Sequence, residues 1–245
     1  MTANNYDNKT QSSKKLVIFL TILVSGALGI RFYFFPYDVP LTADALYYFL
    51  YSSDILHLNK LPDNWTPANN GWPILVSIVF TIFNSDNIFT LMQIQRVLSV
   101  ILSVLTIIPI FYLCRKFVSK EFAIIGGVII AFDPRLMINS FLGITDSLSL
   151  LLITTSLVLF LSSNKKMEYF SFILAGFCVL VRMEGMALFL VLTIMYFIKH
   201  KNQGLEKFYK YGIMLGVFLL IIVPMNIYEN SVNDIENSPK NIISN

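Results

Sequence analysis

Charged side chains are scarce in this sequence. Asp, Glu, Lys and Arg make up 13% of its 245 residues, whereas 56% of the residues are apolar. Soluble domains carry about 25% charged residues, and a single buried core cannot absorb so large an apolar excess. The composition therefore predicts a protein whose solvent is largely lipid. No basic face accompanies the apolar segments, which argues against nucleic acid as a partner.

Cysteine is rarer still, with two residues in the sequence. Cys114 and Cys178 both lie in apolar stretches and lack the spacing of metal ligands, so we interpret them as small buried hydrophobic residues. The sequence also lacks an internal repeat, which argues against a transporter built from paired repeats.

Long apolar runs are what the sequence has in abundance. A helix needs about 20 residues to cross a hydrocarbon core of about 30 Å. Most of the runs approach or exceed this length, and the fifth is interrupted by the charged sequence Arg182-Met183-Glu184-Gly185. The runs are Leu16–Phe35, Ile88–Leu113, Phe117–Phe132, Phe141–Leu161, Phe170–Ile198 and Phe208–Tyr228.

Basic residues between the runs predict how the chain is threaded. If their four groups all face the cytoplasm, the positive-inside rule is satisfied and the N-terminus is cytoplasmic. Phe170–Ile198 must then be a hairpin that turns at Arg182–Gly185, and Phe117–Leu161 a hairpin that turns near Asp133–Asp146. The alternative is one tilted helix over 170–198 that carries Arg182 and Glu184 in mid-membrane. The four groups are Lys9, Lys14 and Lys15; Arg115, Lys116 and Lys120; Lys165 and Lys166; and Lys199, Lys201, Lys207 and Lys210.

The predicted fold is all-α: a polytopic membrane protein with about seven transmembrane helices and short interfacial helices in the first outer loop. We expect a disordered cytoplasmic N-terminus at 1–15, a transmembrane module at 16–228 with its outer loop at 36–71, and a short, disordered outer-side tail at 229–245. Leu41–Leu56 is predicted to be a helix at the membrane surface, and Trp72–Phe83 an interfacial or re-entrant helix. The expected location is the cell membrane or an equivalent endomembrane.

The first outer loop places a carboxylate and several phenols on one helical face. Asp44, Tyr47, Tyr48 and Tyr51 follow the spacing i, i+3, i+4 and i+7. A carboxylate among phenols at a membrane boundary suits a general base that acts on a hydroxyl acceptor. The same residues are also typical of an interfacial aromatic belt, so both interpretations stay open here.

Two further charged clusters fall on the same predicted side of the membrane. Asp133, Arg135 and Asp146 can bind a divalent metal or a phosphate, or form a solvated turn in which Asp133 precedes a helix-stopping proline. Arg182 and Glu184 can hold and orient a phosphate, or only mark a hairpin turn. The joint placement of the three clusters predicts one exterior cavity for an anionic, lipid-linked donor, with the acceptor entering from outside.

In order along residues 16–228, these features resemble the membrane module of the GT-C class of glycosyltransferases. That class includes the dolichyl-phosphate-mannose protein mannosyltransferases and the aminoarabinose transferases of bacterial lipid A. The stretches that carry the resemblance are Arg31, Thr42-Ala43-Asp44-Ala45-Leu46-Tyr47-Tyr48, Asn70-Gly71-Trp72-Pro73-Ile74-Leu75, Gln95-Arg96-Val97-Leu98-Ser99, Ala131-Phe132-Asp133-Pro134-Arg135, Gly143-Ile144-Thr145-Asp146-Ser147 and Leu180-Val181-Arg182-Met183-Glu184-Gly185.

The resemblance implies inverting transfer of a sugar from a polyprenyl (dolichyl)-phosphate sugar to a hydroxyl of a protein or lipid acceptor, on the outer face. Asp44 would be the base, and Asp146 would help to position the acceptor, a metal or the sugar. Arg135 or Arg182 would hold the donor phosphate. No cofactor is certain; if a divalent metal takes part, Asp44 and Asp146 are its candidate ligands. The remaining candidate substrate-binding residues are Tyr47, Tyr48, Asp133 and Glu184.

A function without catalysis is the alternative. Relatives carry further helices after this module, so the chain could instead be a non-catalytic or truncated membrane subunit that binds a lipid carrier or a partner glycosyltransferase.

Overall fold

The computed structural model describes residues 3–67, 70–83 and 85–236. Within these residues all regular structure is helical, as the sequence predicts. The helices are α1 (Ala3–Tyr33), α2 (Ala43–Leu58), α3 (Gly71–Phe83), α4 (Ile88–Leu105), α5 (Ile107–Cys114), α6 (Lys120–Phe132), α7 (Pro134–Leu142), α8 (Asp146–Phe160), α9 (Lys165–Val181), α10 (Gly185–Lys199) and α11 (Glu206–Glu236).

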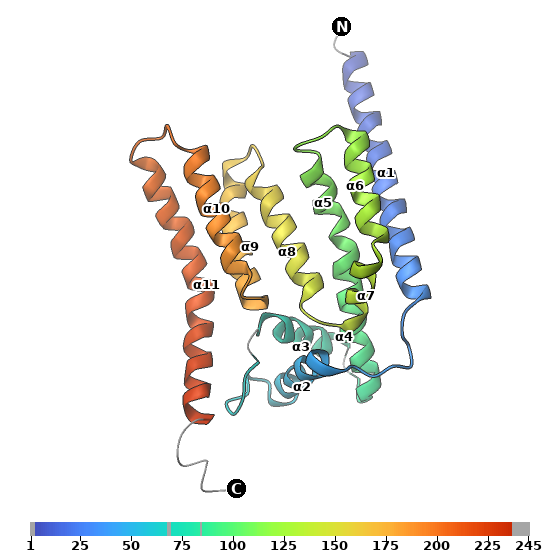
Figure 1. The fold of residues 1–245 in the computed structure, drawn as a ribbon, viewed down its shortest axis with the longest axis vertical. Helices are drawn as coiled ribbons and strands as arrows, with labels where there is room; N and C mark the ends of the chain where they lie inside the picture. Colours follow the sequence, from blue (N-terminus) through green and yellow to red (C-terminus); the bar gives the residue numbers. More distant parts are fainter. Residues whose placement is uncertain (1–2, 68–69, 84, 237–245) are drawn as a thin grey trace, which may run out of the picture.

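The long axes of most helices run side by side, and α2 and α3 lie across one end of the bundle that they form (Figure 1). The links α1–α2, α3–α4 and α9–α10 are at this end, together with α7. The links α5–α6, α8–α9 and α10–α11 lie at the opposite end, which also holds the N-terminus. The predicted basic groups are therefore gathered at the end of the bundle away from α2 and α3.

Three helical stretches of the described chain have the length and apolar composition of membrane spans: Lys14–Tyr33, Ile88–Cys114 and Glu206–Val232. The predicted number of about seven transmembrane helices is therefore not confirmed. α8 and α10 each have 15 residues, which gives a rise of about 22 Å and falls short of a hydrocarbon core of about 30 Å. These shorter helices complete the bundle between the long ones (Figure 1).

The hairpin predicted at Arg182–Gly185 is confirmed, and the alternative of one continuous helix over 170–198 is wrong. α9 ends at Val181 and α10 begins at Gly185. A Cβ atom on Gly185 would lie 2.4 Å from the backbone nitrogen of Val179 and 2.6 Å from the carbonyl carbon of Cys178. Only glycine allows so close a return of the chain.

The second predicted hairpin is also present, with a short helix in its turn. α6 ends before Asp133, whose side chain accepts a hydrogen bond from the backbone N–H of Leu136 at 2.8 Å and so caps α7. Pro134 occupies the first turn of α7, where a missing N–H costs nothing. Gly143 ends α7 with a φ of 74° and leads into α8.

The ends of the chain differ in part from the prediction. α1 begins at Ala3, so the backbone of residues 3–15 is helical where the sequence analysis expected disorder. The segment contains no proline or glycine that would end a helix started by the apolar run after it. α11 likewise extends to Glu236, and the rest of the predicted tail lies outside the described residues.

Separate apolar cores hold the bundle and its cross-lying helices together. One core packs the four helices α8, α9, α10 and α11 together. In it the ring of Phe189 on α10 stacks on that of Phe218 on α11, with centroids 3.8 Å apart. Another packs Phe49 of α2 and Trp72 and Phe80 of α3 against α4, α8 and α9. This second core fixes α2 and α3 to the end of the bundle and so determines where the outer-loop residues lie.

Candidate functional site

Arg182 is the centre of the charged groups at the α2–α3 end of the bundle. It lies in the turn between α9 and α10 and is about one-third exposed. Its Nη1 is paired with the carboxylate of Asp146, and its Nη2 and Nε donate to Glu184 Oε1 at 2.7 and 3.2 Å. The bond to Glu184 raises the pKa of Arg182 and lowers the pKa of Glu184. One guanidinium is thus held between two carboxylates.

Asp146 is fixed by its place at the start of α8. Its second carboxylate oxygen accepts a hydrogen bond from Asn139 of α7 at 3.4 Å, and the neighbouring Thr145 hydroxyl lies 3.5 Å from Arg182 Nη1. A shallow pocket of about 300 Å³ opens over these groups and is lined by Asn139, Asp146, Arg182 and Glu184 together with apolar residues of α7 and α8. The structure therefore brings together three of the predicted site residues from two separate clusters.

One phenol of α2, that of Tyr48, lies near this group. The Tyr48 phenol is close enough to Arg182 for the two to interact electrostatically. Asp44 lies one turn before Tyr48 on the same face, is exposed, and makes no hydrogen bond or ion pair with another described residue. Ala43, just before it, has a φ of 47°, an unusual value for a residue with a side chain. Asp44 is thus a carboxylate at a helix start that its neighbours leave open to a ligand.

Tyr47 turns toward a different neighbour. Its ring meets the edge of Trp65 with centroids 5.1 Å apart, and Tyr51 meets the same indole at 5.0 Å. Trp65 is held in turn by a hydrogen bond from its Nε1 to Asp54 at 2.8 Å. Burial raises the pKa of Tyr51 well above its ordinary value. The predicted aromatic face of α2 is therefore partly a packing surface for the loop that follows.

That loop is tied to α11. Asn70 donates to Glu229 at 2.7 Å, and the Tyr228 hydroxyl donates to the carbonyl of Pro62. The next residue, Gly71, starts α3 against the end of α9: a Cβ there would lie 2.8 Å from the carbonyl carbon of Leu180. These contacts place the start of α3 directly beside the turn that carries Arg182.

Three buried residues to which the sequence analysis gave no role hold this end together. Gln95 Nε2 donates to the backbone carbonyls of Ala45 at 3.0 Å and of Gly143 at 2.8 Å. Trp72 Nε1 donates to the same Gly143 carbonyl at 3.1 Å. The start of α2 is thereby joined through α4 to the segment just before Asp146. The available signal was the presence of two glutamines, Gln93 and Gln95, inside the apolar run 88–113.

Arg96 plays a similar part on the other side of α4. Its Nη1 donates to the carbonyls of Val39 at 2.6 Å and Pro36 at 3.2 Å, and its Nη2 to that of Pro40 at 3.0 Å. The side chain is 4% exposed. This guanidinium is therefore occupied by the backbone that leads into α2, and it orders the approach to Asp44.

The predicted residues Asp133 and Arg135 do not join the Arg182 group through any contact among the described residues. Asp133 caps α7 and lies near Arg31, whose Nη1 donates to the carbonyl of Ala131 at 2.8 Å and ties α1 to α6. Arg135 is exposed on the first turn of α7 and has no hydrogen bond or ion pair in the described chain. Of the two arginines proposed to hold a phosphate, Arg182 is the one surrounded by other candidate residues.

An apolar groove lies beside the same turn. It has a volume of about 280 Å³ and runs between α3, α8 and α9, where Ile74, Leu148, Leu152 and Phe177 contribute to its walls. Leu180 and Val181 also line it, and they immediately precede Arg182. An apolar chain in this groove would therefore have one end next to a guanidinium.

A metal site at the predicted ligands gains no support from the geometry. The described residues contain no group of three or more His, Cys, Asp or Glu placed to hold a metal ion. Asp146 is paired with Arg182, whose positive charge opposes that of a bound cation. The donor set does not fit a divalent metal, and no chemical step is derived through one.

Comparison with known proteins adds one match. The family model of the dolichyl-phosphate-mannose-protein mannosyltransferases matches residues 71–228, a range that includes Asp146, Arg182 and Glu184 and begins after Asp44. No curated protein and no solved structure matches the chain. Because the matched residues make up more than half of the sequence, the chain belongs to the dolichyl-phosphate-mannose-protein mannosyltransferase family.

Proposed function

We propose that this protein transfers a sugar from a polyprenyl-phosphate sugar to a hydroxyl group of a protein or lipid acceptor, with inversion, on the outer face of the membrane. The observation that carries the proposal is the position of Arg182. At Arg182 a cationic group, two carboxylates and an apolar groove lie next to one another. They do so at one end of a bundle that contains helices long and apolar enough to span a membrane. A lipid-linked phosphate needs both an apolar channel and a fixed cation.

Arg182 is the residue proposed to hold the donor phosphate. Asp146 anchors the guanidinium from one side, whereas Glu184 on the other side is 61% exposed and free to rotate toward water. A phosphate oxygen can take the place of Glu184 on Nη2 and Nε, which are the donors of a bidentate contact. In this scheme Asp146 positions Arg182, and Glu184 moves away from Nε and Nη2 of Arg182 when the donor arrives.

Asp44 is the proposed general base. It lies on the face of α2 that also carries Tyr48, near Arg182, and no described residue occupies its carboxylate. It would accept the proton of the acceptor hydroxyl as the oxygen attacks the anomeric carbon. The bond from that carbon to the phosphate oxygen breaks, polyprenyl phosphate leaves, and a single displacement inverts the configuration.

The orientation follows from the distribution of basic residues. The four basic groups lie at the end of the bundle opposite Arg182. Under the positive-inside rule this basic end would be cytoplasmic, together with the N-terminus. In this arrangement α1, the α4–α5 pair, α6, α8, α9, α10 and α11 make seven crossings, with the shorter helices crossing a locally thinned bilayer.

The test is sugar transfer in proteoliposomes that contain the host's own lipid-phosphate sugars. Wild type is compared with Asp44→Asn at equal insertion, and Asp38→Asn serves as the matched control, because Asp38 is an exposed carboxylate of the same loop outside α2. We expect transfer by the wild type and by the control, and none by Asp44→Asn. Transfer by Asp44→Asn at the wild-type rate would refute the base. Donor binding without transfer in all three would favour the non-catalytic subunit.

A further inference from the structure

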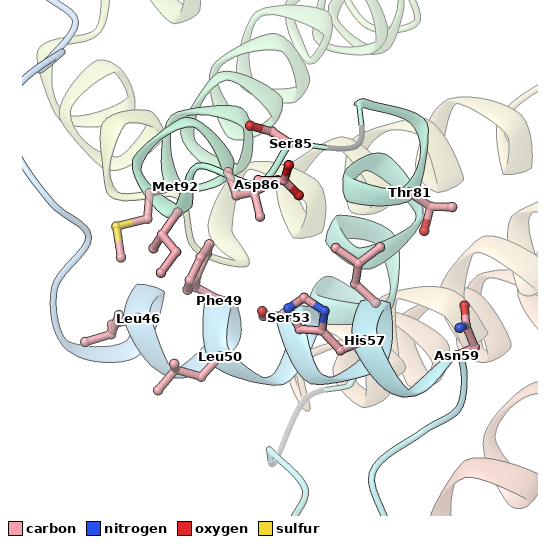
Figure 2. Close-up of a pocket in the computed structure, with 13 residues that line it drawn as sticks. Leu46, Phe49, Leu50, Ser53, His57, Asn59, Thr81, Ser85, Asp86 and Met92 are labelled. Carbon is pink, nitrogen blue, oxygen red and sulfur yellow. The ribbon is translucent and has the colours of Figure 1, made fainter.

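A second, larger pocket lies at the same end of the bundle and is separate from the Arg182 group. It has a volume of about 720 Å³ and lies between α2, the end of α3 and the start of α4 (Figure 2). None of its lining residues is shared with the pocket over Arg182 or with the apolar groove. Its size is within the range of about 300–1,000 Å³ that is common for small-molecule sites.

The pocket uses the opposite face of α2 from Asp44 and Tyr48. Phe49, Ser53, Leu56 and His57 line it from α2. At 100° per residue, Ser53 projects about 180° away from Asp44 around the helix axis. A ligand in this pocket is therefore separated from the proposed base by the whole thickness of α2, so it cannot be the donor held at Arg182.

Several residues that line the pocket are polar, and none of the lining residues is Lys or Arg. Ser53 and His57 project from α2, Thr81 lies on α3, and Ser85 and Asp86 lie in the link to α4 (Figure 2). His57 and Asp86 are exposed, and neither has a hydrogen bond or ion pair with a described side chain. Hydroxyl, imidazole and carboxylate groups suit a ligand with several hydroxyls, whereas an anionic phosphate would face Asp86 without a fixed positive charge.

The other lining residues are largely apolar. Phe49 of α2 and Leu91 and Met92 of α4 are among them. Beside the pocket, Ile82 and Phe83 at the end of α3 and Ile88 and Phe89 at the start of α4 are all half or more exposed. Apolar side chains so exposed next to a pocket are typical of a surface that meets a membrane or a partner. The pocket thus combines a polar side with an apolar side that continues into these exposed residues.

From this combination we propose that the pocket binds an uncharged glycosyl diacylglycerol from the surrounding leaflet. The hydroxyls of its sugar head contact His57, Asp86 and Ser53, and its acyl chains leave over the exposed apolar residues of α3 and α4. The lipid is bound without chemical change. The inference stands apart from the proposed glycosyl transfer, because lipid occupancy is measured without a donor or an acceptor.

The experiment is native mass spectrometry of the full chain in detergent with added lipids of identical acyl chains. The probes are monogalactosyl diacylglycerol, phosphatidylglycerol, phosphatidylethanolamine and, as a head without chains, methyl galactoside. The variants are Asp86→Leu and His57→Leu. The matched control is Asp38→Leu, which changes an exposed carboxylate outside the pocket, and Asp44→Asn tests the independence of the two faces. Thermal unfolding verifies that each variant is folded.

We expect one molecule of monogalactosyl diacylglycerol to bind more tightly than either phospholipid, and methyl galactoside not to bind. Each pocket variant should weaken this binding about tenfold, the order of loss expected for one hydrogen bond. Asp38→Leu and Asp44→Asn should bind as the wild type does. Equal binding of all three lipids, stronger binding of a phospholipid, binding of the free sugar alone, or folded pocket variants that bind normally would each overturn the proposal.

Discussion

The guanidinium of Arg182 donates two hydrogen bonds to one oxygen of Glu184, at 2.7 and 3.2 Å, while its remaining nitrogen is held by Asp146. The two carboxylates differ in exposure: the side chain of Glu184 is 61% exposed and that of Asp146 is 32% exposed. In the proposed scheme Asp146 is the partner that stays on Arg182, and Glu184 is the one that the donor phosphate replaces.

Replacing this arginine tests the proposed phosphate site. Arg182→Gln removes the positive charge, and Arg182→Lys keeps the charge but removes the paired N–H donors of the guanidinium. Both should raise the KM for the lipid-linked donor. For Arg182→Gln we expect a rise of about 100-fold, as when one partner of a hydrogen-bonded charge pair is lost. Arg135→Gln is the matched control, because Arg135 is exposed and unpaired within the described residues. Donor titrations in proteoliposomes give the KM. A larger effect of Arg135→Gln than of Arg182→Gln would assign the phosphate to the other arginine.

Glycine at position 185 should be required for the hairpin that carries Arg182. In Gly185→Ala the new Cβ would lie 2.4 Å from the Val179 backbone nitrogen, and backbone atoms cannot move aside cheaply. We expect destabilisation of about 2 kcal/mol or more, measured as a fall in the midpoint of thermal unfolding in detergent. Gly212→Ala is the control, since a Cβ there has nothing within 4 Å. An unchanged midpoint in Gly185→Ala would show that the turn adopts another path.

The two hairpins were predictable because charged residues are easily recognised within long apolar runs. Arg182 and Glu184 interrupt a run of apolar residues, and the lysines on either side of that run require it to turn back. The number of full crossings was not predictable in the same way. Hydropathy identifies apolar segments, but helices of 15 residues such as α8 and α10 satisfy it without reaching the length of a span.

The site itself was predictable only as a set of residues on one side. The pairing of Arg182 with Asp146 depends on the packing of α8 against α9, to which sequence spacing gives no access. Asp133 looked equivalent to Asp146 in the sequence, yet its carboxylate is used to cap α7. The roles of Gln95 and Arg96 rest on hydrogen bonds to backbone carbonyls far along the chain, and such contacts leave no pattern in a single sequence.

Gln95 should control the order of α2. Gln95→Leu keeps a side chain of similar size in α4 but removes the hydrogen bonds to the carbonyls of Ala45 and Gly143, of which the second still accepts from Trp72. The expected cost is about 2 kcal/mol. Hydrogen–deuterium exchange should rise in residues 43–58 and stay at the wild-type level in 185–199. A uniform rise in exchange across the chain would indicate general destabilisation instead of a local effect of Gln95 on α2.

A buried charge cluster at the other end of the bundle gives the last prediction. Glu168 is 3% exposed and pairs with Lys199 at 2.7 Å and with His200 at 2.9 Å, while Lys199 also donates to the carbonyl of Phe160 at 3.1 Å. These contacts join the ends of α8, α9 and α10. Glu168→Gln would leave Lys199 without its counter-charge. Because the Lys199 side chain is 38% exposed, water screens part of this loss, and the expected cost is about 1–3 kcal/mol.

Glu206→Gln provides the comparison, because Glu206 pairs with Lys210 on an exposed helical turn and water screens such a pair. The midpoint of thermal unfolding should therefore fall strongly in Glu168→Gln and hardly at all in Glu206→Gln. Equal small shifts would show that water reaches the Glu168 cluster and screens its charges. A strong shift in Glu168→Gln alone would establish that Glu168 stabilises the junction of α8, α9 and α10.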